Sequence, residues 1–68
     1  MNNKFSKRLY ELRKELNLSQ NELAKKIGVT QKAVDFWEKE INEPKASYII
    51  NLANLFDVST DYLLGLED

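Results

Sequence analysis

Apolar residues recur along the chain at intervals of three or four, the spacing that places side chains on one face of a helix. The first such stripe consists of Phe5, Leu9, Leu12 and Leu16, with charged residues between them. This stripe predicts an amphipathic helix that ends near Asn17. No segment alternates apolar and polar residues with the period of two typical of half-buried strands, so we expect no sheet.

Capping residues mark the next two helices. Ser19 followed by Glu22 forms a capping-box pattern, which predicts the start of the second helix. That helix is expected to stop at Gly28, since glycine tolerates the left-handed conformation that follows a helix end. Thr30 is a typical N-cap for a third helix over about residues 31–39.

Two further helices are expected after a loop at Asn42-Glu43-Pro44. The fourth covers about residues 46–56, and either Ser59 or Thr60 caps a short fifth helix that ends at Gly65. The prediction is an all-α fold of five short helices, forming one domain over residues 1–68, because a chain of this length supports a single small core.

Composition narrows the possible functions. The sequence has no Cys and no His, and it therefore lacks thiolate metal ligands, disulfides and the commonest general base. We expect no enzyme, no metal, no cofactor and no small-molecule ligand. No stretch approaches the roughly 20 apolar residues of a membrane helix, and the start lacks the apolar core of a signal peptide. A cytoplasmic protein without a membrane partner is expected.

Charge is distributed unevenly, although the net charge is only −1. Residues 1–34 carry eight Lys or Arg and three Glu, whereas residues 35–68 carry two Lys and eight Asp or Glu. The basic half could face a polyanion while the acidic half faces water. Ordinary charge scatter on a surface is the alternative, and charge alone does not choose between them.

The segment 20–39, QNELAKKIGVTQKAVDFWEK, has the features of a helix-turn-helix. Ala24 allows two helices to approach closely, and Gly28 allows a positive φ in the turn. Val34 and Trp37 are apolar residues that anchor the second helix of this motif, at about residues 31–39, in the core. The polar residues Gln31 and Lys32 begin that helix on its outward face.

The sequence resembles the Cro/phage-repressor type of helix-turn-helix protein, the XRE family. The resemblance is carried by LSQNELAKKIGVTQKAV at 18–34, Trp37-Glu38, Asn42-Glu43-Pro44 and LANLFDVSTDYLLG at 52–65. It implies a five-helix, lambda-repressor-like domain that binds double-stranded DNA as a homodimer, most often to repress transcription. The abundance of Lys over Arg and the seven Asn hint at an AT-rich bacterial or phage genome.

The resemblance also implies roles for individual residues. Base-reading positions are occupied by Gln31, Lys32, Asp35 and Phe36. Gln20 occupies a position that contacts DNA backbone or a base. Further candidates for backbone phosphate contacts are Asn17, Asn21, Lys39, Asn42 and Lys45. Gln can pair with adenine, Lys can reach guanine, and an aromatic ring can contact a thymine methyl group.

Three residues depart from the family pattern. Asp35 stands where a small polar residue is common, and its carboxylate is repelled by phosphate unless it accepts from cytosine or pairs with Lys32 or Lys39. Phe36 replaces a polar residue and could contact DNA or pack against protein. Glu40 occupies a turn position where glycine is frequent.

Two further expectations concern an ion pair inside the domain and a surface for homodimer formation. Arg13 and Glu38 occupy positions that family members commonly join by a partly buried ion pair. Apolar residues crowd a short segment near the C-terminus; some of them must fill the core, and a leftover apolar patch would suit a self-complementary dimer face. The candidate residues for that face are Tyr62, Leu64 and Leu66.

The leading hypothesis is a sequence-specific DNA-binding transcriptional regulator, expected to be a repressor that binds an inverted-repeat operator as a homodimer. The alternative is a protein-interaction module, such as an antitoxin or anti-repressor, built on the same fold. Asp35, Phe36 and the acidic second half favour this alternative more than a basic reading helix would.

Overall fold

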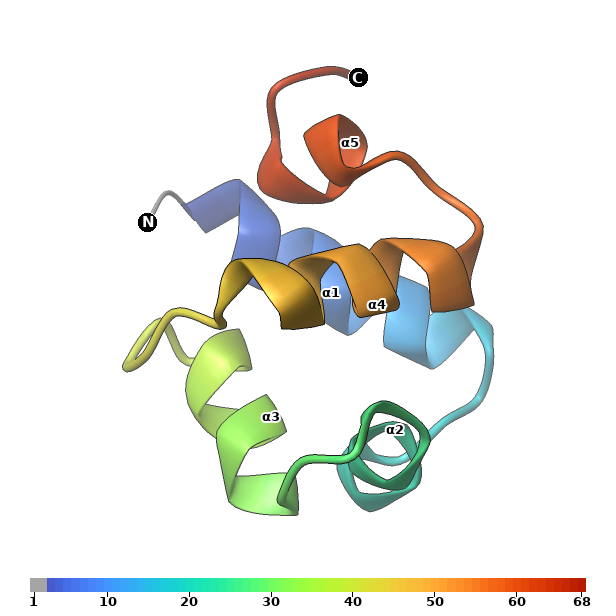
Figure 1. Ribbon diagram of the computed structural model, residues 1–68, viewed down its shortest axis with the longest axis vertical. Helices are drawn as coiled ribbons and strands as arrows, with labels where there is room; N and C mark the ends of the chain where they lie inside the picture. Colours follow the sequence, from blue (N-terminus) through green and yellow to red (C-terminus); the bar gives the residue numbers. More distant parts are fainter. Residues whose placement is uncertain (1–2) are drawn as a thin grey trace.

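Five α-helices make up the computed structural model, which describes residues 3–68, and no strand occurs in that range. The helices are α1 (Asn3–Glu15), α2 (Gln20–Ile27), α3 (Gln31–Glu38), α4 (Ala46–Phe56) and α5 (Thr60–Leu64). The predicted all-α architecture is therefore confirmed. In Figure 1, α4 lies across α1, α5 lies at one end, and α2 and α3 form the opposite end.

Local capping sets the helix starts. Ser19 accepts a hydrogen bond from the Glu22 backbone N–H, and the Glu22 side chain accepts one from the Ser19 N–H, which completes the predicted capping box. Thr30 caps α3 through the Ala33 N–H. Of the two candidates for the cap of α5, Ser59 takes the position and accepts from the Tyr62 N–H.

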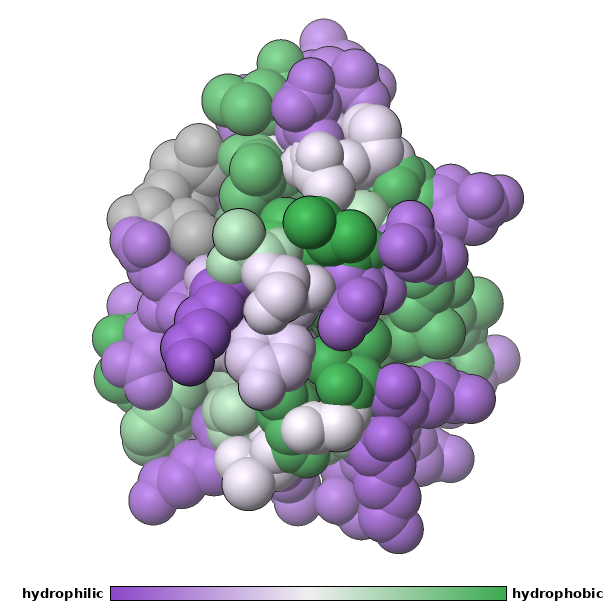
Figure 2. All heavy atoms as spheres, viewed as in Figure 1, coloured by the Kyte–Doolittle hydropathy of each residue, from purple (hydrophilic) through white to green (hydrophobic). Residues whose placement is uncertain are grey.

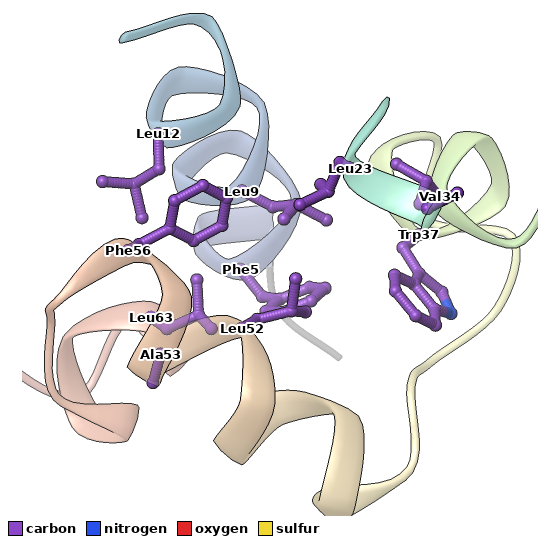
Figure 3. Packing of buried hydrophobic residues seen from close by; sticks show 11 residues of the cluster. Phe5, Leu9, Leu12, Leu23, Val34, Trp37, Leu52, Ala53, Phe56 and Leu63 are labelled. Atoms are coloured by element: carbon purple, nitrogen blue, oxygen red, sulfur yellow. The ribbon is translucent and has the colours of Figure 1, made fainter. Parts of the chain in front are cut away.

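The core lies between the five helices, each of which turns apolar side chains toward it (Figure 3). Figure 3 shows Leu12 and Phe56 near one another between α1 and α4, with Trp37 on the side of α3. The buried apolar residues are Phe5, Leu9, Leu12, Leu23, Ala24, Val34, Trp37, Leu52, Ala53, Phe56 and Leu63. Trp37 is 5% exposed, and its ring lies 5.9 Å from the Tyr48 ring, tilted by 40°. All five helices thus contribute to one core.

One expectation about α1 is wrong. Leu16 was expected on the apolar stripe, but α1 ends at Glu15 and Leu16 is 51% exposed. The physical reason is the turn that follows, where Asn17 takes a positive φ of 57° and the chain leaves the helix before Leu16 can face the core. The face that Leu16 would have covered ends instead with Arg13, which is buried.

The surface is mixed in character. Figure 2 shows apolar side chains gathered over the middle of this view, where α4 lies, and hydrophilic side chains over α2 at its lower edge. No helix between residues 3 and 68 has the length and apolar character needed to cross a membrane. Within the same range, no cluster of three or more His, Cys, Asp or Glu side chains is placed to hold a metal ion.

Candidate nucleic-acid interface

The turn between α2 and α3 has the geometry that the sequence predicts. Gly28 takes a φ of 85°, and the N–H groups of Gly28 and Val29 both donate to the carbonyl oxygen of Ala24. A Cβ at Gly28 would meet no atom within 4 Å, so the backbone conformation and not space requires glycine there. Ala24 is 1% exposed, and its small side chain permits the close packing of α2 on α3.

The first turn of α3 presents its polar residues to solvent. Gln31 and Lys32 are exposed, whereas Val34 and Trp37 on the other side of the helix are buried. Phe36 is half-buried, and the Lys32 ammonium lies 5.5 Å from the centre of its ring. The four predicted base-reading residues therefore fall on a helix whose opposite face is fixed in the core.

Asp35 is paired within the protein. Its Oδ2 lies 3.0 Å from the Lys39 Nζ, and its Oδ1 accepts a hydrogen bond of 3.1 Å from Gln20 Nε2. The hydrogen bond from Lys39, followed by that from Gln20, lowers the pKa of Asp35 below its ordinary value. The pairing with Lys39 is one of the two that would relieve phosphate repulsion at this position.

Arg13 and Glu38 form a bidentate ion pair between α1 and α3. Arg13 Nε lies 2.7 Å from Glu38 Oε2 and Nη2 lies 3.0 Å from Oε1, while Nη1 donates to the Leu18 carbonyl oxygen. Both side chains are less than one tenth exposed. The hydrogen bond to Glu38 raises the pKa of Arg13, so the guanidinium stays charged.

Gln20 connects these two pairs. Its Nε2 donates to Asp35 Oδ1 and also to Glu38 Oε1, each at 3.1 Å. Sequence reasoning placed Gln20, Asp35 and Glu38 in separate roles and missed that they form one network. The signal available in the sequence was the helix-turn-helix itself, which brings the start of α2 beside the outward face of α3.

The predicted backbone-contact residues lie in or next to the helix-turn-helix, with Asn21 in the first turn of α2. All of them are exposed: Asn17, Asn21, Lys39, Asn42 and Lys45. Asn17 takes a φ of 57° just before α2, and Lys45 stands at the N-cap of α4 without a side-chain capping bond. Their exposure leaves them accessible to a ligand along both ends of the helix-turn-helix.

The predicted dimer-face residues differ in exposure. Tyr62 and Leu64 are half-buried, whereas Leu66 is 70% exposed. Arg8, which sequence reasoning missed, lies 4.2 Å above the Tyr62 ring and donates to the backbone oxygens of Tyr62 and Glu67. No local pattern could have indicated this contact, since it joins residues more than 50 positions apart.

The chain belongs to the helix-turn-helix family, whose model it matches over residues 9–63. It is 41% identical over 64 residues to an uncharacterized HTH-type transcriptional regulator, YobD, from Bacillus subtilis (strain 168). That match covers 94% of this chain and 57% of YobD, and the chain spans about half the length of the curated relatives it matches. The predicted resemblance to the Cro/phage-repressor type is therefore confirmed.

Solved structures support the same fold. The P22 c2 repressor protein in complex with synthetic operator 9T superimposes with a TM-score of 0.82 at 32% identity, covering 87% of this chain and 89% of that one. The lambda-repressor-like fold expected from the sequence is thus confirmed.

A shorter stretch of 49 residues is 45% identical to antitoxin HigA1 of Mycobacterium tuberculosis, covering 72% of this chain and 33% of HigA1.

Proposed function

We propose that this protein is a sequence-specific DNA-binding regulator that represses transcription from an inverted-repeat operator. The observation that carries this proposal is the α2–turn–α3 unit, which presents Gln31 and Lys32 from a helix anchored by Val34 and Trp37. The similar P22 c2 repressor structure contains an operator, which supports the same use of this fold. A repressor of this bacterial or phage type acts in the cytoplasm.

The first turn of α3 would enter the major groove, where base edges differ in their donors and acceptors. Gln31 can form two hydrogen bonds with adenine, and Lys32 can donate to O6 and N7 of guanine. The Phe36 ring lies close to Lys32 and can contact a thymine methyl group. Exposed Asn17, Asn21, Asn42 and Lys45 would hold the flanking phosphates.

Binding as a homodimer would double the length of DNA that is read. One helix covers only a few base pairs, whereas two-fold pairing places two such helices about 34 Å apart, one turn of DNA. The exposed Leu66, together with the half-buried Tyr62 and Leu64, offers apolar surface for pairing through the C-terminal region.

Selection of bound sequences from a random DNA pool tests the proposal. We expect an inverted repeat, protected symmetrically in footprints and bound less tightly as salt rises. Gln31→Ala or Lys32→Ala should each cost about 1–3 kcal/mol on that operator and relax preference at one or two positions. Asn54→Ala, an exposed change on α4, should leave binding unaltered.

The antitoxin or anti-repressor alternative is not favoured, because the match to HigA1 is shorter than the match to YobD. The same variants separate the two functions. Unchanged DNA binding by the Gln31 and Lys32 variants, together with loss of a protein partner on Phe36→Ala, would replace the regulator with the interaction module.

A further inference from the structure

Two carboxylates fix the orientation of the Gln20 side-chain amide. Gln20 Nε2 lies 3.1 Å from Asp35 Oδ1 and 3.1 Å from Glu38 Oε1. Ionised carboxylate oxygens only accept hydrogen bonds, so the nitrogen and not the oxygen of the amide must face them. Both N–H groups of the amide are therefore engaged inside the protein.

The carboxylates are themselves held in place. Glu38 accepts two hydrogen bonds from Arg13, and Asp35 is paired with Lys39 at 3.0 Å. The lowered pKa of Asp35 keeps this carboxylate ionised at neutral pH. Hydrogen bonds to ionised acceptors are roughly twice as strong as those between neutral groups. Two strong hydrogen bonds to carboxylates therefore hold the Gln20 amide with its nitrogen turned inward.

The amide oxygen remains for a ligand. Gln20 Oε1 has no hydrogen bond to any described residue, and no buried side-chain polar atom of residues 3–68 lacks a partner, so Oε1 reaches solvent. An amide oxygen can only accept, as can a phosphate oxygen, and the two cannot hydrogen-bond to each other. Turning the amide to donate to phosphate would point Oε1 at two carboxylates.

The donors that DNA offers in the major groove are the exocyclic amino groups of adenine (N6) and cytosine (N4). We propose that Gln20 reads such an amino group through Oε1, rather than contacting phosphate, and that Asp35 and Glu38 are the positioning residues that turn this oxygen outward. The inference rests on the proposed function. It assigns a specificity-determining role to α2, next to the outward face of α3.

Nucleotide analogues that lack one amino group test this directly. In the selected operator, each adenine is replaced singly by purine and each cytosine by 2-pyrimidinone, and affinity is measured for the parent chain and for Gln20→Ala. At one position the analogue should weaken binding of the parent by about three- to tenfold more than it weakens binding of Gln20→Ala. Lost base pairing affects both proteins equally and cancels in the comparison.

A parallel series replaces single phosphates by neutral methylphosphonates. If the Gln20 side chain is coupled to a methylphosphonate position and to no amino group, this inference is overturned. The proposed function would still stand if Gln31→Ala and Lys32→Ala weaken binding to the operator. A random pool that yields no preferred sequence would overturn the proposed function and this inference with it.

The positioning role of Asp35 has its own test. Asp35→Ala should abolish the coupling between Gln20 and the amino group, whereas Asp35→Asn should retain it, because an amide oxygen can still accept from Nε2. Asp61→Ala, an exposed change on α5, is the matched control and should retain the coupling. If Asp35→Ala keeps full coupling at an unchanged melting temperature, Asp35 does not position Gln20.

Discussion

Arg13 of α1 and Glu38 of α3 share two hydrogen bonds, of 2.7 and 3.0 Å, at a site where both side chains are almost removed from solvent. The same guanidinium donates to the Leu18 carbonyl oxygen at the turn that leads into α2. One arginine therefore ties together α1, the start of the helix-turn-helix, and the helix proposed to read DNA. The pair belongs to the framework of the site, and its effect should be seen first in stability.

A double-mutant cycle at these two residues should show coupling well above about 0.5 kcal/mol in the free energy of unfolding. Removing one partner leaves a buried charge, and Arg13→Met or Glu38→Gln alone should cost about 3–5 kcal/mol. The Asp35–Lys39 pair, which is more accessible to solvent, is the control and should couple more weakly, because solvent screens it. Additive effects of the Arg13 and Glu38 changes would contradict the prediction.

Trp37 should be the most costly single truncation in α3. It is 5% exposed, packs beside Tyr48, and its backbone oxygen accepts a 2.6 Å hydrogen bond from buried Ser6. Trp37→Ala should destabilise the fold by about 3–5 kcal/mol, close to the whole stability of a domain this small. Thermal unfolding of the variant checks this, and a melting temperature within a few degrees of the parent would show that Trp37 is not a core residue.

The features that could be predicted from the sequence are those set by neighbours along the chain. Ser19, Glu22 and Gly28 define helix ends through contacts within five residues, and the structure has them as predicted. The link from Gln20 to Asp35 and Glu38 depends on contacts 15 and 18 residues away, after the turn has formed. The prediction that Leu16 faces the core was wrong, because apolar periodicity does not show that the chain leaves the helix at the turn formed by Asn17.

Glu40 carries backbone strain that glycine would remove. It has a φ of 63° in the turn after α3, a left-handed conformation that is unfavourable for a residue with a Cβ. Glu40→Gly should stabilise the fold by about 0.5–1 kcal/mol, since relief of strain exceeds the added flexibility of the unfolded chain. Glu40→Ala keeps the strain and removes the side chain, so it is the control in urea unfolding. Equal effects of both changes would contradict a backbone cause.

Acid should weaken the start of α2 through Glu22. The hydrogen bond from the Ser19 backbone lowers the pKa of this carboxyl below its ordinary value. A carboxyl with a lower pKa in the folded state stabilises the protein above its unfolded-state pKa, and this contribution is lost as pH falls through the folded-state pKa. Glu22→Gln keeps an acceptor for Ser19 but cannot titrate, so the variant should lose less stability between neutral pH and about pH 3. The same change at exposed Glu11 is the control, and identical acid unfolding of the parent and Glu22→Gln would contradict this effect.

Removing the Asp35 side chain and removing the Lys39 side chain should have opposite effects on affinity for DNA of random sequence, where only phosphate contacts count. Each is the other's counter-charge, and together they contribute no net charge to the interface. Asp35→Ala frees Lys39 and removes a charge that phosphate repels, so it should raise affinity for DNA of random sequence. Lys39→Ala leaves Asp35 exposed to phosphate and should weaken binding more than Lys45→Ala, which removes a cation alone and should reduce the salt slope by about one.

The double change at Asp35 and Lys39 should restore affinity close to that of the parent, because it removes both charges at once. Fluorescence titrations of a labelled random duplex over a range of salt concentrations measure all four variants. If Asp35→Ala weakened binding to random DNA, the carboxylate would be contributing a contact of its own, and its pairing with Lys39 would not explain its presence on the face proposed to read DNA.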